Sequence, residues 1–280
     1  MRVERRKRIK IFRGIVVFGF ILAAVMSVTS LTQHVFSEKA GTEAGMAGFD
    51  RVPYYLEENA QRYLSYSSQN PNLKEEDVVW QVNADMDKES YSNANVIEKG
   101  NEDKRGVLVN KHNRLRNRYE PYSLVTSLSG ILVTPDTADA IEKMSQDASY
   151  NGLNLQACSG YRSFEKQEEI YERYKRENGR EYADNYSARP QFSEHHTGRA
   201  IDLISPAGIT DDFESTAECK WVHKNAWKYG FILRYPKGSE EITGYSYEPW
   251  HITYVGTEIS KKMKKEGIDT LEEYWGKYMV

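Results

Sequence analysis

Apolar and polar residues are spaced as in helices along several segments of this chain, and they alternate at the start of a short segment in its second half. Residues 53–67, 73–83, 164–175 and 216–229 have helical spacing. Residues 200–204 begin with an apolar–polar alternation and predict a strand, and 106–109 and 251–255 predict two more. Helices and short strands are mixed without regular βαβ repetition, so we predict an α+β fold.

The first 33 residues have a different pattern. Seven Lys and Arg side chains within residues 1–13 precede an uncharged, largely apolar run at 14–33. About twenty apolar residues can span a bilayer, and a preceding basic flank favours an inside N-terminus. We therefore predict a cytoplasmic flank (1–13), a single-pass membrane anchor (14–33) and an extracytoplasmic remainder. A cleaved signal peptide has the same layout and stays open as the alternative.

Composition changes twice between the apolar run and the second half of the chain. Residues 34–49 are mostly small and polar, which predicts a flexible tether. Residues 50–105 predict a small helical extension packed on a domain at 106–280. The formal net charge is −3 with the basic flank included, so the remainder is more acidic still. Nucleic-acid binding is not expected, because its usual footprint is a basic patch.

Two short motifs combine imidazoles with carboxylates. The first runs from Ser193 to Asp202 and contains two adjacent histidines, and the second is Glu248-Pro249-Trp250-His251. A loop that turns at Gly198 could bring one of the histidines back beside Asp202, and a neighbouring strand could deliver His251. Two imidazoles, a carboxylate and a second carboxylate nearby are what metal-assisted hydrolysis requires. The alternative is that polar residues merely cluster in loops.

The motif Ser-x-His-x-x-Gly-x-Ala-x-Asp followed by Glu-Pro-Trp-His resembles the zinc D-alanyl-D-alanine carboxypeptidases of the VanY type. Further stretches match that family in the same order over roughly residues 106–270: Ser159-Gly160-Tyr161-Arg162-Ser163 with Gln167, Asn225-Ala226-Trp227-Lys228-Tyr229-Gly230-Phe231, and Arg234-Tyr235-Pro236-Lys237-Gly238 leading into Ile242-Thr243-Gly244-Tyr245. The resemblance implies a small, mainly antiparallel sheet with helices packed around it.

The resemblance also implies roles for individual residues. The implied zinc ligands are His195, Asp202 and His251. Glu248 matches the general base and Arg162 matches the arginine that stabilises the oxyanion. Ser159, Gln167 and Ser193 match polar residues that line the substrate site. His196 competes with His195 for the first ligand position, although relatives commonly carry a non-ligand residue there.

The function implied is zinc-dependent removal of the terminal D-alanine from peptidoglycan stem peptides. LD-carboxypeptidase and endopeptidase activities use the same scaffold, and a non-catalytic wall-binding module is a further alternative. The sequence leaves the oligomeric state open. Cys158 and Cys219 could form a disulfide outside the cytoplasm, but we expect two separate buried thiols.

Overall fold

The structure is a computed structural model of the chain, and it describes residues 48–206, 208 and 212–279. The predicted basic flank (1–13), membrane anchor (14–33) and all but the last two residues of the predicted tether (34–49) lie outside the described residues. Among the helices that are described, none combines the length and the apolar character that crossing a membrane requires. Contacts divide the chain after Pro71 into two compact units, and the domain ranges inferred from the sequence remain predictions.

The first unit contains two short 3-10 helices, η1 (Phe49–Arg51) and η2 (Glu57–Asn59), and the helix α2 (Ala60–Gln69). The Tyr63 ring packs against two other aromatic rings, with centroids 5.9 Å from Phe49 and 5.4 Å from Tyr55. Of the helix predicted over 53–67, only the part from Ala60 onward is α-helical. It ends just before Pro71, as expected, because the residue before a proline disfavours helical geometry.

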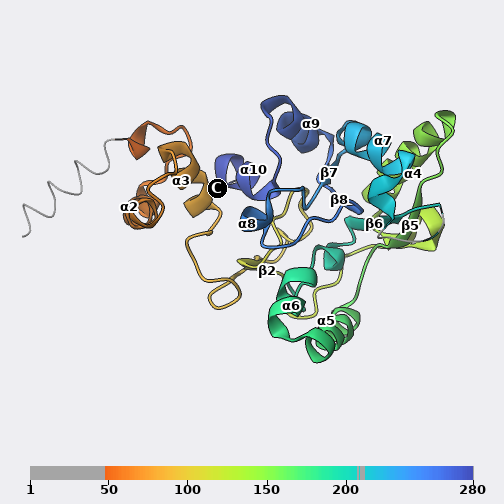
Figure 1. Cartoon of the computed structure of the whole chain (residues 1–280), viewed down its shortest axis with the longest axis horizontal. Helices are drawn as coiled ribbons and strands as arrows, with labels where there is room; N and C mark the ends of the chain where they lie inside the picture. Colours follow the sequence, from red (N-terminus) through yellow and green to blue (C-terminus); the bar gives the residue numbers. More distant parts are fainter. Residues whose placement is uncertain (1–47, 207, 209–211, 280) are drawn as a thin grey trace, which may run out of the picture. The chain divides into compact units, whose positions relative to one another are not determined.

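A four-stranded antiparallel sheet organises the second unit, in the order β5-β6-β8-β7 (Figure 1). Its strands are β5 (Gln156–Ser159), β6 (Ala200–Ile204), β7 (Phe231–Leu233) and β8 (His251–Tyr254). The strands predicted over 200–204 and 251–255 are confirmed as β6 and β8. The predicted α+β architecture of a small antiparallel sheet with surrounding helices agrees with this arrangement.

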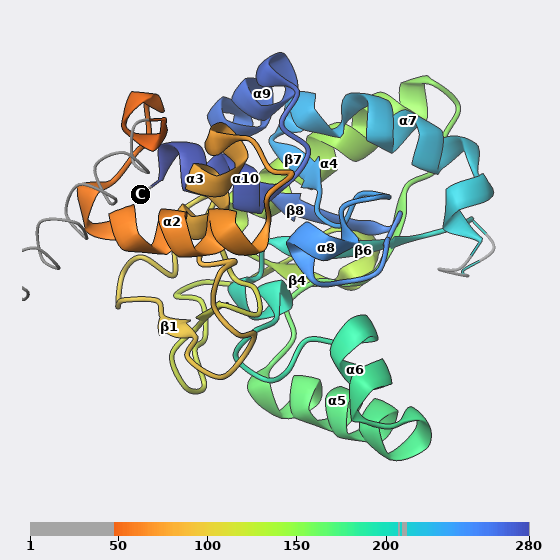
Figure 2. The ribbon, with the colours of Figure 1, turned by 60° about the vertical axis from the view of Figure 1, so that its left-hand side comes forward.

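One face of this sheet carries the main hydrophobic core. Ile201, Leu203 and Ile252 point into it and are fully buried. The core is completed by side chains from α4 (Pro135–Tyr150) and α7 (Ala217–Asn225), with η5 (Phe213–Ser215) and η6 (Ala226–Tyr229) flanking α7. Figure 2 shows the sheet between these helices and a separate pair, α5 (Phe164–Asn178) and α6 (Arg180–Tyr186). The helices predicted over 164–175 and 216–229 are thus present.

Local signals explain where these helices begin. The Ser163 hydroxyl accepts a hydrogen bond from the Lys166 N–H at the start of α5 (3.2 Å). The Thr216 hydroxyl does the same for the Cys219 N–H at the start of α7 (3.0 Å). Such N-caps satisfy N–H groups that have no partner within the helix.

The remaining helices of the second unit are α3 (Glu75–Asn83), α8 (Glu240–Thr243), α9 (Thr257–Glu266) and α10 (Leu271–Tyr278). Helices α3 and α10 cross closely at Gly276. A Cβ atom at this position would lie 2.2 Å from the Trp80 carbonyl oxygen, so only glycine fits there. The Asn83 amide also donates to the Gly276 carbonyl (3.0 Å). The helix predicted over 73–83 is confirmed as α3.

The strand predicted over 106–109 is wrong. These residues form a turn and an extended segment, while the short strands nearby are β1 (Asn95–Val96), β2 (Asn113–Arg114), β3 (Val125–Thr126) and β4 (Leu132–Val133), with η3 (Leu128–Gly130) between the last two. Leu108 and Val109 are buried in two different apolar clusters. Their hydrophobicity therefore reflects packing on both sides of an irregular segment and not pairing with a strand.

Cys158 and Cys219 do not form a disulfide with each other. Cys219 is buried in the core, as expected, but Cys158 is exposed. On β5, Ala157 pairs with Leu203 and Ser159 pairs with the next residue, Asp202, so Cys158 is the extra residue at an irregularity of the strand register. The expectation of two buried thiols was therefore wrong for Cys158.

Candidate active site

Strand register brings three of the predicted site residues into one row across the sheet. Asp202 on β6 is paired with His251 on β8 on one side and with Ser159 on β5 on the other. Paired residues on antiparallel strands point to the same face. Because Ile201 and Leu203 point into the core, Asp202 points to the opposite face, and the row lies on that face.

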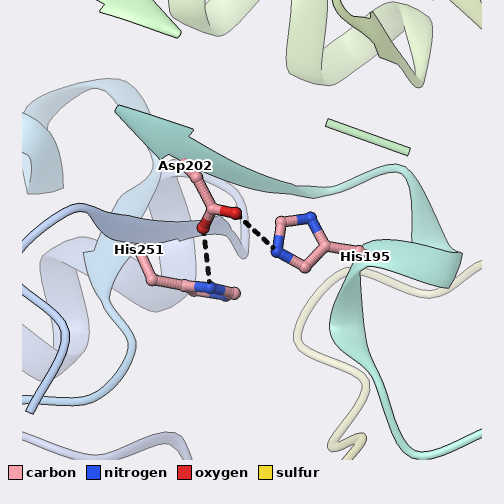
Figure 3. A group of neighbouring side chains, drawn as sticks. All are labelled: His195, Asp202 and His251. Atoms are coloured by element: carbon pink, nitrogen blue, oxygen red, sulfur yellow. Dashed lines mark ion pairs between the residues drawn. The ribbon is translucent and has the colours of Figure 1, made fainter. Parts of the chain in front are cut away.

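His195 reaches the same point from η4 (Glu194–Thr197), which precedes β6. This 3-10 turn ends at Gly198 in the left-handed conformation (φ 66°), where a Cβ atom would lie 2.9 Å from the Leu124 side chain. The tight turn folds His195 back over the strand. Its Nε2 lies 3.1 Å from Asp202 Oδ2, and His251 Nδ1 lies 3.1 Å from Asp202 Oδ1 (Figure 3).

The hydrogen bonds of His195 fix its tautomer. Its Nδ1 donates to the Gly160 carbonyl oxygen at 2.7 Å. The proton is thus on Nδ1, and the lone pair of Nε2 points toward Asp202. A carbonyl behind the ring is the usual partner of a metal-ligating histidine. Burial and the nearby Arg162 guanidinium lower the pKa of His195, which favours the neutral ring that a metal requires.

The three side chains fit a divalent metal ion such as zinc. One ligand atom from each of His195, Asp202 and His251 lies within 4.8 Å of the other two. Asp202 Oδ1 is buried without a hydrogen-bond partner among the described residues. Burial alone would raise the pKa of Asp202, but the two imidazoles hold it well below its usual range, so the carboxylate is ionised. Two imidazoles and one carboxylate match the three-ligand sets of catalytic zinc centres.

His196 does not join this group. Its Nδ1 donates to the Arg162 carbonyl oxygen (2.6 Å), and its Nε2 accepts from the Gln191 N–H (3.2 Å). Both ring nitrogens are therefore engaged in holding the backbone. Burial lowers the pKa of His196 to about 4 and keeps the ring neutral. Of the two adjacent histidines, only His195 faces Asp202.

Glu248 lies in the loop before β8, where the His251 N–H donates to its carbonyl oxygen (3.2 Å). Its carboxylate Oε2 is 3.5 Å from His251 Nδ1. Burial raises the pKa of Glu248 to about 7; His251 opposes this shift and the Asp202 charge adds to it. We call His195, Asp202 and His251 the metal-ligand cluster. A carboxylate with a pKa near neutrality next to this cluster has the properties of a general base.

Arg162 approaches the cluster from the loop between β5 and α5. One guanidinium nitrogen donates to the Ser159 hydroxyl (2.9 Å) and lies 3.4 Å from Asp202 Oδ2, and the other donates to Gln167 Oε1 (2.9 Å). Gln167 in turn donates to Ser187 and to the Ala188 carbonyl. Ser159 and Gln167, predicted to line the substrate site, therefore hold the guanidinium in position.

These groups share one cleft with a volume of about 350 Å³. Ser193, the residue before η4, is buried and lines it. The wall away from the sheet comes from α5 and the end of α6. The residues lining the cleft are Arg162, Gln167, Ile170, Arg173, Tyr174, Tyr186, Ser187, Ala188, Ser193, Glu194, His195, Asp202, Tyr235, Tyr245, Glu248, Trp250 and His251. The structure thus brings most of the predicted site residues to one cleft, and their assigned roles remain predictions.

A buried acidic residue beside the cluster was missed by sequence reasoning. Glu194 Oε2 lies 3.6 Å from His251 Nε2 and accepts a hydrogen bond from the Thr253 hydroxyl (2.6 Å). Its other oxygen accepts from Arg234 Nε (2.6 Å). Although burial would raise it, the Arg234 guanidinium lowers the pKa of Glu194 to about 2. Glu194 stands within the first motif, but nothing in the sequence indicates that Arg234 and Thr253 lie beside it.

Comparisons with known proteins agree with this geometry. The family described as VanY, D-alanyl-D-alanine carboxypeptidase, matches residues 130–257. A Bacillus subtilis (strain 168) protein named YodJ is 41% identical over 183 residues, which cover 61% of this chain and 67% of that protein. The bifunctional D-Ala-D-Ala dipeptidase and D-Ala-D-Ala carboxypeptidase VanXYC of Enterococcus gallinarum is 35% identical, over 60% of this chain and 91% of that protein.

Two solved structures are similar over most of their length. One is the LD-carboxypeptidase LdcB, with a TM-score of 0.61 and 38% identity, covering 68% of this chain and 92% of that one. The other is the vancomycin resistance D,D-pentapeptidase VanY from a VanB-type cassette in complex with Zn(II). It has a TM-score of 0.54 and 31% identity, and the match covers 61% of this chain and 98% of that one. These likenesses show that the chain belongs to the VanY family of D-alanyl-D-alanine carboxypeptidases.

Proposed function

We propose that this protein is a zinc-dependent carboxypeptidase that removes the terminal D-alanine from peptidoglycan stem peptides ending in D-Ala-D-Ala. The observation that carries the proposal is the convergence of His195, Asp202 and His251 at one point of the cleft, with Glu248 beside them. The solved VanY relative contains Zn(II), and the VanXYC relative is named for D-Ala-D-Ala carboxypeptidase activity.

The metal would be held by His195 Nε2, the Asp202 carboxylate and His251 Nδ1. When bound, zinc lowers the pKa of a coordinated water to about 7 and acts as a Lewis acid. The protein's contribution is to fix the ligand geometry. Gly160 holds the tautomer of His195, and strand register holds Asp202 against His251.

Glu248 would move the proton. Its carboxylate takes a proton from the attacking water and later delivers it to the nitrogen of the leaving D-alanine. Its place in the cleft beside His251 supports this role, because a general base must lie within hydrogen-bond reach of the proton that it accepts.

Arg162 would meet the negative charge that develops on the scissile carbonyl oxygen. Its guanidinium is permanently cationic and is held by Ser159 and Gln167, so little reorganisation is needed when the charge forms. Ser193 would line the site of the terminal residue.

A second candidate is removal of D-alanine from tetrapeptides, which the likeness to the LD-carboxypeptidase LdcB favours. The same ligand set serves both reactions, so the cleft walls must decide between them. Incubation of the full-length chain with pentapeptide, tetrapeptide and crosslinked dimer, followed by mass spectrometry, separates the possibilities. Release of D-alanine from pentapeptide supports our proposal. Release only from tetrapeptide would assign LD-carboxypeptidase activity, dimer cleavage would indicate an endopeptidase, and no cleavage with zinc bound would indicate a wall-binding module.

We also propose that residues 14–33 anchor the protein in the cell membrane, with the cleft on the extracytoplasmic side where peptidoglycan is found. The support is the basic flank followed by the uncharged run. A surface-sensitive reporter fused after residue 50 should be exported and remain in the membrane pellet after a high-salt wash. A mature protein that begins near residues 28–35 and is found in the medium would instead indicate a cleaved signal peptide.

A further inference from the structure

The α5–α6 pair carries a row of tyrosines that the proposed chemistry does not use. The rings of Tyr182 and Tyr186 are stacked with centroids 4.4 Å apart, and Tyr174 meets Tyr182 edge-on at 6.3 Å. Tyr182 is 41% exposed and Tyr186 is 50% exposed. We call these three residues the tyrosine row.

The tyrosine row is continuous with the cleft. Tyr174 and Tyr186 line the same cleft as Asp202 and His251. Figures 1 and 2 show the α5–α6 pair standing apart from the sheet that carries the metal-ligand cluster. A molecule whose reacting end lies at the cluster can therefore extend along this wall onto the exposed rings.

The tyrosine row is not the only contact described between α5 and α6. A separate contact joins the two helices: the Tyr171 hydroxyl on α5 donates to Asp184 on α6 (2.8 Å), and Arg189, in the segment after α6, holds the same carboxylate with two nitrogens (2.9 and 2.8 Å). Tyr171 is buried, whereas Tyr182 and Tyr186 leave much of their ring surface open to solvent. Exposed aromatic rings next to a cleft are typical of binding surfaces.

The surroundings of the row favour a neutral ligand. Side chains of both signs alternate along α5, and several pair with one another, as Lys166 does with Glu169 and Lys175 with Glu172. With the two signs interspersed, and with the Arg173 guanidinium 5.4 Å from the centroid of the Tyr174 ring, this wall has no single sign of charge that would select a charged ligand. A sugar ring presents C–H groups that stack on an aromatic face and hydroxyl groups that hydrogen-bond to polar neighbours, and it carries no charge.

We propose that the tyrosine row is a subsite for the glycan part of peptidoglycan. The inference rests on the proposed function, in which a stem peptide occupies the cleft with its C-terminal end at the metal-ligand cluster. A stem peptide is joined to the glycan strand at its opposite end. The sugar is thus the part of the substrate that leaves the cleft, and the tyrosine row lies along a wall of that cleft.

The test compares one pentapeptide in two forms, free and attached to its N-acetylglucosaminyl-N-acetylmuramyl disaccharide. With the full-length chain, kcat/KM should be about tenfold higher for the disaccharide form, the order of effect expected for one stacked aromatic face. Tyr186→Ala should lower the ratio of kcat/KM for the disaccharide form to kcat/KM for the free pentapeptide to about one. Tyr186→Phe keeps the ring and should retain the advantage. Tyr150→Ala, at a tyrosine on α4 that is 78% exposed and outside the cleft, is the matched control.

If Tyr186→Ala lowers kcat/KM equally for both substrates, the ring has a structural role and the subsite is overturned. The subsite is also overturned if the wild-type protein has the same kcat/KM for the two forms. Binding of the peptide-free disaccharide, measured by saturation-transfer NMR, decides the matter even if neither pentapeptide is cleaved. Transfer to the sugar protons that Tyr186→Ala abolishes supports the subsite independently of the reaction. Absence of transfer in wild type, together with no disaccharide advantage, refutes it.

Discussion

Two buried polar clusters lie next to each other in the second unit, and their hydrogen bonds are satisfied to different degrees. In the metal-ligand cluster, Asp202 Oδ1 is buried without a hydrogen-bond partner among the described residues. In the neighbouring network, Arg234 uses Nε for Glu194 and both terminal nitrogens for Glu272. Buried polar atoms are nearly always paired in proteins, so the few that are not call for an explanation.

The difference separates side chains arranged to hold a metal ion from a network whose charges are paired with one another. The Arg234 network lies in the protein interior, and the large cost of burying its charges is offset by paired, charge-assisted bonds. In the metal-ligand cluster, His195 Nε2 and His251 Nδ1 instead both face the Asp202 carboxylate, where a metal ion could be held. Glu194 belongs to both, because one oxygen faces Arg234 and the other faces His251. Substitutions in the metal-ligand cluster should therefore mainly affect zinc binding and hydrolysis, whereas substitutions in the Arg234 network should mainly affect the stability of the fold.

The largest effect is expected in the metal-ligand cluster. His195→Ala, Asp202→Ala and His251→Ala should each remove most of the bound zinc and nearly all hydrolysis, because three ligands leave little redundancy. Metal content after gel filtration and D-alanine release measure the two effects. His196→Gln is the control and should keep both, since its nitrogens hold backbone groups. If His196→Gln loses the metal while His195→Ala retains it, the wrong imidazole has been assigned.

The next effect concerns folding. Arg234→Met removes the guanidinium that pairs with both Glu194 and Glu272, so two buried carboxylates lose the cation that balances their charge. We expect a loss of about 3–5 kcal/mol in the free energy of unfolding, the usual range for breaking a buried pair. Urea unfolding measures it. Lys166→Met, which breaks an exposed pair with Glu169, should change stability by well under about 1 kcal/mol. Equal effects of the two substitutions would contradict the distinction between buried and exposed pairs.

A smaller effect should separate binding from chemistry. Glu248→Gln keeps the size of the side chain but cannot accept a proton at neutral pH. Zinc occupancy should stay close to wild type, and kcat should fall about a hundredfold or more, because general base catalysis contributes about that much. Metal analysis and kinetics on the same preparation are needed. Loss of zinc in this variant would make Glu248 a ligand and not the base.

The members of the metal-ligand cluster could be predicted because the two motifs resemble the VanY family, whereas the residue pattern alone only permits them to meet. The alternation at 200–204 gives the strand, Gly198 gives the turn, and one neighbouring strand supplies His251. The Arg234 network could not be predicted in this way. Its members come from η4, the end of β7 and α10, which are brought together only by the tertiary fold. The prediction of a strand over 106–109 failed for the same reason, because the apolar residues of this segment pack in two different clusters.

The smallest expected effect lies where the two clusters meet. Glu194 is ionised and buried, and its Oε2 is 3.6 Å from His251 Nε2, the ring nitrogen that faces away from Asp202. A carboxylate behind a ligating imidazole orients the ring and increases its basicity, and its loss typically weakens metal binding about 10- to 100-fold. We therefore expect Glu194→Gln to raise the dissociation constant for zinc by about tenfold, measured by competition with a chelating dye.

Glu272→Gln is the matched control for this last prediction. This substitution also removes one negative charge that pairs with Arg234. Among the contacts of the described residues, Glu272 has none with His251. Both variants should lower the midpoint of urea unfolding, since each leaves Arg234 with one ionised partner. Only Glu194→Gln should weaken zinc binding. If the two variants weaken zinc binding equally, the effect comes from general loosening of the fold. The two clusters would then form one structural unit, with no separate role for Glu194 in orienting the ligand.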